Sequence, residues 1–248
     1  MFDPYHTPAE EMEPAHNLAE LDDLVVDDVF KAVLQRVYLW MALGLLVTTA
    51  TAFATAFTPL GTFVFSNIYI FFGLFIGELV LVAALSAGIQ KLHPSLAGAM
   101  FFVYAAINGI TLSSIFMVYE LGSIGLAFFI AACMFGAMSL IGYSTKKDLS
   151  QWRSFLMMGL IGLIVVSIVN LFLGNAGMDW FISIIGVLLF LGLTVYDTQK
   201  IKKMTVLSLQ MGDEAVASKM GILGALSLYL DFVNIFLYLL RFFGRRRR

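Results

Sequence analysis

Seven long apolar stretches, separated by short polar connections, constrain this chain more than any other feature. Their approximate ranges are 37–57, 68–88, 96–118, 124–144, 154–173, 181–199 and 222–243. Each is close to the roughly 20 residues that a helix needs to cross the hydrocarbon core of a bilayer. Because a segment in lipid must satisfy its backbone hydrogen bonds internally, these stretches predict membrane-spanning helices.

The composition argues against a soluble domain. Hydrophobic residues make up 60% of the 248 residues, the mean hydropathy is +0.90, and only 13% of residues carry charge. A soluble domain carries roughly 25% charged residues. One core cannot hide this much apolar surface, whereas a bilayer accepts it. We therefore expect an all-α polytopic membrane protein, folded as a seven-transmembrane-helix bundle.

The charged residues divide the chain into three parts. Nine of the 17 acidic residues lie in the first 28 positions. This acidic, proline-containing composition predicts a disordered tail over residues 1–28. The transmembrane domain is expected over residues 29–244, and four arginines form a basic end at 245–248. The pattern indicates neither a second domain nor nucleic-acid binding.

The connections between spans predict the orientation. The side that holds the N-terminus carries ten basic residues, and the three connections on the other side carry none. The ten are Lys31, Arg36, Lys91, Lys146, Lys147, Arg153, Lys200, Lys202, Lys203 and Lys219. Since basic loops stay cytoplasmic, we expect a cytoplasmic N-terminus. If the last span crosses the membrane completely, the basic end at 245–248 lies on the non-cytoplasmic side. We favour this full crossing over a re-entrant course, which stays open.

Three carboxyl side chains lie inside predicted spans: Glu78, Asp197 and Asp231. Ionisable residues at such depth are costly and are functional candidates by default. At a rise of about 1.5 Å per residue, Glu78 and Asp231 lie at nearly the same level, and Asp197 lies nearer the inner end. The alternatives are an internally hydrogen-bonded structural role, or for Asp197 solvation by lipid headgroups.

The last span carries small and polar side chains at steps of three and four residues, which is one face of a helix. The members are Gly224, Ser227, Asp231, Asn234, Tyr238 and Arg241. Such a stripe does not face lipid, so the last helix is predicted to be central. A weaker stripe on the sixth span contains Thr194 and Asp197. Helix–helix adhesion is the simpler explanation of both.

Two carboxyl groups in a low-dielectric site tend to share one proton. Carboxylate oxygens are also the ligands that Ca²⁺ prefers. We therefore predict proton-sensitive cation handling, with Asp197, Asp231 and Glu78 as candidate Ca²⁺ ligands. The expected pathway residues are Glu78, Asn108, Ser227 and Asn234. Among positive charges, only Ca²⁺ is expected to reach mid-depth, since Lys91 and Lys200 lie at the ends of spans. No cofactor is expected beyond Ca²⁺ and protons as ligands.

Catalysis has little support in the sequence, and we expect no enzyme. The three histidines lie in the tail and in one connection, and no phosphate-binding loop is present. Tyr196-Asp197 and Asp231 are similar to the aspartates of intramembrane aspartyl proteases, but the glycines that precede the second aspartate there are missing here. Gly73 and Gly77, beside Glu78, permit a close helix contact, although this spacing is common by chance in apolar sequence.

Four segments resemble the transmembrane Bax-inhibitor-motif family, and its bacterial branch most closely. They are Ala106-Ile107-Asn108-Gly109-Ile110-Thr111-Leu112-Ser113, Thr145-Lys146-Lys147-Asp148-Leu149, Leu193-Thr194-Val195-Tyr196-Asp197-Thr198-Gln199 and Leu228-Tyr229-Leu230-Asp231-Phe232-Val233-Asn234. The resemblance runs from about Val29 to Gly244.

The resemblance implies a seven-helix bundle of the bacterial inner membrane, with the last helix in the centre. It also implies a pH-sensitive calcium leak gated by the pair that matches Asp197 and Asp231, with Glu78 lining the same cavity. Some members latch the pair with a basic residue of the second span. Here the interior of that span has none, and Lys91 lies at its end.

The resemblance also implies a non-transporting alternative. Bacterial relatives are described as modulators of a membrane-anchored AAA protease, and eukaryotic ones as suppressors of cell death. In that case the acidic tail and the arginine-rich end would bind the partner. Membrane lipid is a partner under either hypothesis.

Overall fold

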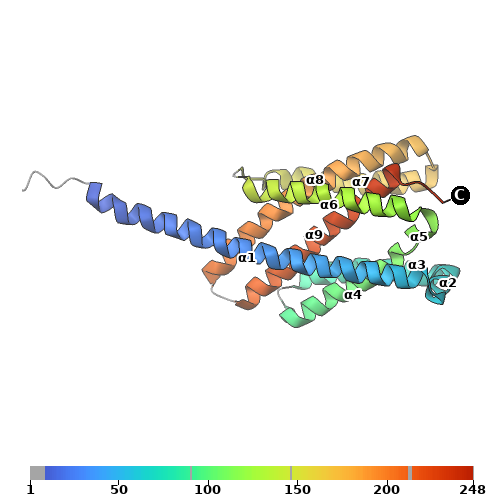
Figure 1. Cartoon of the computed structure of the whole chain (residues 1–248), viewed down its shortest axis with the longest axis horizontal. Coiled ribbons are helices and arrows are strands. Elements are labelled where there is room, and N and C mark those ends of the chain that lie inside the picture. Colours follow the sequence, from blue (N-terminus) through green and yellow to red (C-terminus); the bar gives the residue numbers. More distant parts are fainter. Residues whose placement is uncertain (1–8, 90, 146, 212–213, 248) are drawn as a thin grey trace, which may run out of the picture.

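The computed structural model describes residues 9–89, 91–145, 147–211 and 214–247, with side chains over 28–89, 91–145, 147–205 and 218–247. The described chain is helical (Figure 1). The helices are α1 (Ala9–Ala56), α2 (Pro59–Ser66), α3 (Ile68–Gly88), α4 (Pro94–Leu112), α5 (Ile115–Val118), α6 (Leu121–Ser144), α7 (Trp152–Leu173), α8 (Ala176–Met211) and α9 (Glu214–Phe243). Lys146 and Arg248, which the charge analysis uses, lie outside the described residues.

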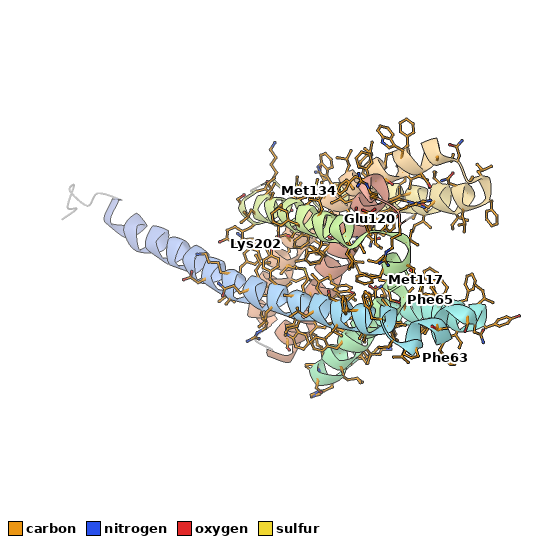
Figure 2. All side chains as sticks on the ribbon, turned by 45° about the vertical axis from the view of Figure 1, so that its right-hand side comes forward. Phe63, Phe65, Met117, Glu120, Met134 and Lys202 are labelled. Atoms are coloured by element: carbon orange, nitrogen blue, oxygen red, sulfur yellow. The ribbon has the colours of Figure 1, made fainter. Side chains whose placement is uncertain are left out.

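Seven helical segments are long and apolar enough to cross a membrane, which confirms the predicted number of spans. Large apolar side chains cover the outside of the bundle (Figure 2). Phe63 is 63% exposed and Phe172 is 84% exposed. A surface of this kind is stable against hydrocarbon and unstable against water. The protein is therefore an integral, multi-pass, all-α membrane protein.

Local chemistry sets several helix ends. Asn67 precedes α3, and its side chain accepts a hydrogen bond from the Tyr69 amide at 3.0 Å, as an N-cap does. Pro94 opens α4 at a position where a proline needs no N–H partner. Gly174 ends α7 with φ 62°, the left-handed conformation that favours glycine.

The third apolar stretch is not one helix. It breaks after Leu112, and the short α5 completes it. At the break, the Ser113 hydroxyl donates to the Ile110 carbonyl at 2.6 Å and the Ser114 hydroxyl donates to the Thr111 carbonyl at 3.0 Å. Serine side chains that bond to the preceding turn compete with the helical ladder and favour a bend.

The first helix is longer than its membrane span. It runs over the 48 residues Ala9–Ala56, whereas a span needs about 20, and it projects beyond the bundle (Figure 1). The composition predicts disorder over residues 1–28, whereas the structure has a helix from Ala9 onward. The physical reason is that Ala, Glu and Leu dominate this segment, and all three are strong helix formers. Residues 1–8 lie outside the described part.

The last helix is central, as predicted. In the most apolar 18-residue stretch of the α9 span, 67% of the residues are buried inside the bundle. The same share for α3 is 11%. It packs against α8, α6, α1 and α4, and crosses the bundle diagonally between them (Figure 1). A helix surrounded on several sides can carry polar groups that lipid would not accept.

The last helix also runs through the whole bundle. The chain beyond α9 pairs with the connection between α5 and α6, where the Glu120 amide donates to the Arg245 carbonyl at 3.0 Å. The connection between α6 and α7 lies at the opposite end (Figure 1). The structure thus follows the full crossing and not the re-entrant alternative.

Candidate ion and proton site

The polar stripe of α9 faces α8. A Cβ at Gly186 would lie 2.7 Å from the Tyr238 ring, and a Cβ at Gly224 would lie 2.9 Å from Ile201. Near the C-terminal end of α9, Arg241 Nη2 lies 3.3 Å from Asp179 Oδ1. The two helices are thus in close contact along most of their shared length, because small residues let the backbones approach.

Asp197 and Asp231 meet in the middle of this seam. Asp231 is 4% exposed, Asp197 is half-buried, and the two carboxyl groups interact electrostatically. Ser227 lies beside Asp197, and Thr194 lies beside Asp231. The predicted pairing of the two aspartates is therefore present in the structure.

One oxygen of this pair is unsatisfied. Among the described residues, Asp231 Oδ2 has no hydrogen-bond partner although it is fully buried. A buried carboxylate oxygen without a partner costs free energy, and a proton or a cation removes that cost. The local chemistry therefore favours binding of either species at this oxygen.

Lys200 is the positive charge near the pair, and it interacts electrostatically with both aspartates. Lys200 follows Asp197 by three residues on α8, so both project from the same face. The sequence places Lys200 at the end of a span, and the structure adds its charge to those that act on the pair.

Glu78 belongs to a separate buried cluster. The Thr111 hydroxyl donates to Glu78 Oε1 at 2.6 Å, and Asn108 Nδ2 lies 3.4 Å from Oε2. The Tyr229 hydroxyl donates to Asn108 Oδ1 at 3.0 Å and is hydrogen-bonded to the Thr48 hydroxyl at 2.7 Å. Side chains from α1, α3, α4 and α9 therefore form one connected network.

The central helix separates the two clusters. Tyr229 and Asp231 are two residues apart, so they project about 200° apart around α9. Asn108 lies with Glu78, and Ser227 lies with the aspartates. The Asn234 amide donates to the Leu230 carbonyl of its own helix at 2.8 Å. The predicted pathway residues thus fall into two groups.

This separation bears on metal binding. Within the described part of the chain, no three His, Cys, Asp or Glu side chains gather closely enough to hold a metal ion. Glu78 therefore does not share one ion with both aspartates. Because Ca²⁺ takes six to eight oxygens, a calcium ion at the pair would need further oxygens from hydroxyl groups, backbone or water.

Several cluster members were not identified from the sequence: Thr48, Thr111 and Tyr229. Threonines are common in apolar spans and carry little signal by themselves. Thr111 is the exception, because it follows Asn108 by three residues and therefore shares its helix face. Tyr229 is 0% exposed, and its ring meets that of Tyr104 edge-to-face at 5.8 Å.

The close helix contact that Gly73 and Gly77 permit is not formed within the described part of the chain, which favours a chance spacing. An added Cβ at either glycine would meet nothing within 4 Å. Among the described residues of α3, only Glu78 and Leu85 are buried, so the helix packs along a narrow line that excludes both glycines. The close contacts lie at Gly109, where a Cβ would collide with the Thr48 carbonyl of α1, and at Gly142, where it would lie 2.7 Å from the Val195 carbonyl of α8.

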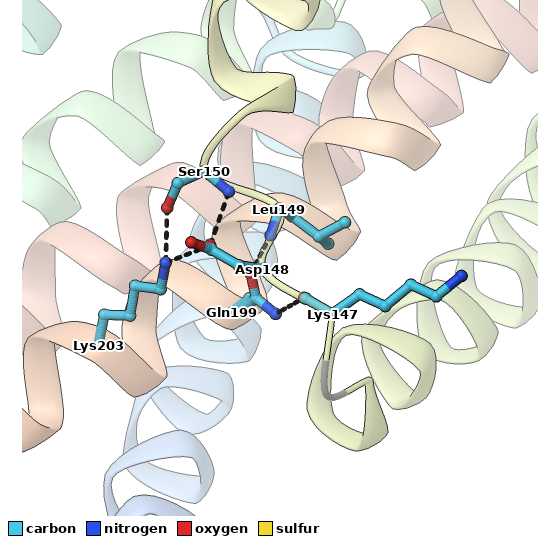
Figure 3. A network of polar contacts seen from close by, with 6 residues as sticks. All are labelled: Lys147, Asp148, Leu149, Ser150, Gln199 and Lys203. Atoms are coloured by element: carbon cyan, nitrogen blue, oxygen red, sulfur yellow. Dashed lines mark hydrogen bonds and ion pairs between the residues drawn. The ribbon is translucent and has the colours of Figure 1, made fainter.

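A surface network ties the α6–α7 connection to α8 near the aspartates (Figure 3). Gln199 lies two residues after Asp197. Its amide donates to the Lys147 carbonyl at 2.6 Å and accepts from the Leu149 amide at 2.8 Å. The Gln199 side chain therefore satisfies two backbone groups of the connection, the Lys147 carbonyl and the Leu149 amide.

Lys203 completes this network. Its Nζ donates to Asp148 Oδ1 at 2.5 Å and to the Ser150 hydroxyl at 2.5 Å (Figure 3). The hydrogen bond from Lys203, together with the Ser150 amide, lowers the pKa of Asp148 to about 2. Asp148 is therefore ionised at any physiological pH.

Comparison with known proteins decides the family. The family model described as "Inhibitor of apoptosis-promoting Bax1" matches residues 30–248. The chain belongs to the Bax inhibitor family. The match includes all four segments that carry the resemblance, and it confirms that identification.

Similar proteins in the family come from distant bacteria. The inner membrane protein YbhL of Escherichia coli is 47% identical over 213 residues, which are 86% of this chain and 91% of that protein. An uncharacterized protein of Borreliella burgdorferi is 41% identical, over 92% of this chain and 97% of its own. An uncharacterized membrane protein of Streptococcus pyogenes is 43% identical, over 71% and 75%.

Proposed function

We propose that this Bax inhibitor family protein is a pH-sensitive cation pathway of the bacterial inner membrane, with Ca²⁺ as the expected ion. Asp197 and Asp231 control the flux, and the N-terminus is cytoplasmic. The observation that supports this proposal most strongly is the fully buried Asp231 Oδ2, which has no hydrogen-bond partner among the described residues and lies beside a second carboxyl group.

Protons and cations compete for the same oxygens at this pair. Two interacting carboxyl groups titrate as a unit, and the proton that they share must leave before a divalent ion binds both. Calcium binding should therefore release protons and weaken as the pH falls. Lys200 is a tethered positive charge that also competes with an incoming cation.

The binding test measures protons directly. Adding Ca²⁺ to purified protein in light buffer should release protons from the wild type and not from the Asp197→Asn/Asp231→Asn variant. Glu78→Gln is the matched control and should behave like the wild type, because Glu78 lies in the separate cluster. Equal release from the wild type and the double variant would rule out the pair as the site.

The flux test uses liposomes loaded with a calcium dye and assayed from about pH 5 to pH 8. Asp231→Asn keeps the shape and removes the charge, so the pH dependence of flux should flatten while the protein still folds. An unchanged pH profile would place Asp231 among structural residues.

A partner-binding function is the second candidate, and the long α1 favours it. Residues 9–27 extend this helix outside the candidate span, and the segment is acidic. Such a segment could dock on a basic surface of a membrane-anchored AAA protease. Deleting residues 1–28 separates the hypotheses, since transport should survive the deletion and partner binding should not. The cut spares Phe30, which is 0% exposed and stacks on Tyr143 at 5.4 Å.

We propose no catalytic role for the aspartates. An intramembrane aspartyl protease would use the same pair, but it must admit a peptide and water. Asp231 is 4% exposed, and Leu228, one turn before it, is 0% exposed. Incubation with a transmembrane peptide substrate should therefore yield no cleavage products.

A further inference from the structure

An apolar groove lies between α1 and α6 at the end of the bundle that holds the C-terminus. It has a volume of about 330 Å³, and α9 forms its floor. Its lining includes Leu45, Phe53, Ile124, Phe128, Phe232 and Phe236. The volume lies in the range of roughly 300–1,000 Å³ that small-molecule sites occupy. We refer to it as the α1–α6 groove.

The groove opens to the membrane. In the most apolar 18-residue stretch of each span, only 28% of the α1 residues and 22% of the α6 residues are buried. Most of the surface of these two helices therefore faces outward. Gly125 of α6 is part of the lining, and an added Cβ there would meet nothing within 4 Å. An apolar groove on the lipid side of a bundle favours hydrocarbon as its occupant.

The C-terminal residues cross the end of this groove. We call Arg245–Arg247 the arginine strap. The Arg245 amide donates to the Ser123 hydroxyl at 3.0 Å, and the Arg247 amide donates to the Val118 carbonyl at 2.9 Å. Arg247 Nη1 donates to the carbonyl of Phe116 at 3.2 Å, and Phe116 itself lines the groove. The backbone of the strap is therefore held against the groove.

The strap carries positive charge without acidic partners. Its three arginines are exposed, and among the described residues none of them forms an ion pair. Asp179, an acid at this end of the bundle, is paired with Arg241 and accepts from Asn170 Nδ2 at 2.6 Å. Exposed guanidinium groups at a membrane surface match phosphate in charge and in hydrogen-bonding geometry.

We propose that the α1–α6 groove and the arginine strap together bind one anionic phospholipid. The acyl chain occupies the groove, and the strap binds the phosphate. Basic sites beside transmembrane helices recognise anionic headgroups in this way, and burial of the chain adds hydrophobic free energy. The site is built from α1, α5, α6 and α9 with the last residue of α4, Leu112, and lies apart from the α8 seam that holds Asp197, so it does not depend on the proposed ion pathway.

The test is native mass spectrometry of the purified full-length protein. The protein is incubated with equal amounts of phosphatidylglycerol and phosphatidylcholine that carry the same acyl chains. The wild type should retain phosphatidylglycerol about tenfold better, as expected for charge-assisted hydrogen bonds. Arg245→Gln/Arg246→Gln/Arg247→Gln keeps the backbone of the strap, so it should retain both lipids about equally.

A second variant tests the groove. Gly125→Leu fills the open space and should lose both lipids. Gly162→Leu on α7 is the matched control, since an added Cβ there also meets nothing within 4 Å, and it should retain lipid like the wild type. The proposal fails if the wild type shows no headgroup preference, or if Gly125→Leu retains as much lipid as the control. A dimer that Gly125→Leu dissociates would also overturn it, because the groove would then be an interface between two copies.

Discussion

Two aspartates of this protein differ in their surroundings and therefore in their chemistry. The Asp148 side chain is 63% exposed and has a lysine partner at 2.5 Å. Asp231 is 4% exposed and has an oxygen without a hydrogen-bond partner among the described residues. The first is a fixed charge that stabilises a connection, and we propose that the second exchanges a proton for a cation.

Lys200→Gln should strengthen calcium binding at the pair by several-fold at pH 8, where protons compete least. The reason is that a positive charge close to the carboxylates repels an incoming cation. Isothermal titration calorimetry measures the affinity. Lys202→Gln is the control, because it removes the same charge from α8 at a different place. The Lys202 ammonium lies over the Phe30 ring, 5.3 Å from its centre. Equal effects of both substitutions would show that only net charge matters.

Asp148→Asn should slightly lower thermal stability in detergent at pH 7. The folded pKa of about 2 lies below the unfolded value of about 3.9, so the ionised Asp148 stabilises the fold fully above about pH 4. This stabilisation is lost as the pH falls through about 2, and the difference between wild type and variant should close over that window. The effect is small because the pair is exposed. In a Lys203→Gln background the substitution should have no further effect.

At the scale of the helices, glycine position decides packing. Gly109 of α4 lies directly against α1, and a Cβ there would collide with the Thr48 carbonyl and the Thr51 hydroxyl. Gly73 of α3 faces open space. Both glycines lie in apolar helices. The spacing of Gly73 and Gly77 in the sequence drew attention to Gly73, whereas the close contact is at Gly109.

Gly109→Ala should therefore destabilise the protein by about 1–3 kcal/mol, the usual cost of overpacking. Gly73→Ala should be neutral or slightly stabilising, since alanine is the better helix former. Thermal unfolding in detergent compares the two variants with the wild type. A large loss of stability for Gly73→Ala would mean that α3 has a partner on that face.

The whole molecule has two chemically different ends. The α6–α7 connection with Lys147 lies at one end, and the arginine strap lies at the other. Gly122 lies in the first turn of α6 and Lys147 lies beyond its last residue, and the 24 residues of this helix span about 36 Å. They therefore report on opposite sides of the membrane.

Single cysteines test this topology in a Cys133→Ser background. Gly122→Cys should react with a membrane-impermeant maleimide added to intact cells, because the loops rich in lysine stay in the cytoplasm. Lys147→Cys should react only after the cells are permeabilised. Labelling of Lys147→Cys in intact cells would invert the orientation.

The sequence by itself determined the seven spans, the central last helix and the candidate aspartates. These follow from length, composition and periodicity, because a bilayer fixes how long an apolar helix must be and penalises charge inside it. The stripe that contains Ser227 and Asp231 needed no coordinates, since a helix with polar groups at steps of three and four must turn them away from lipid.

Only the tertiary structure decided which polar groups meet. Depth along a helix is readable from the sequence, but the direction of a side chain around the helix has meaning only once the neighbours are placed. Glu78 and Asp231 were predicted at one level, yet α9 lies between their clusters. Lys200 of α8 acts electrostatically on the pair, and the strap at Arg245–Arg247 meets helices whose side chains line a groove formed by segments far apart in the chain. Such contacts depend on the packing of whole helices, which no local pattern specifies.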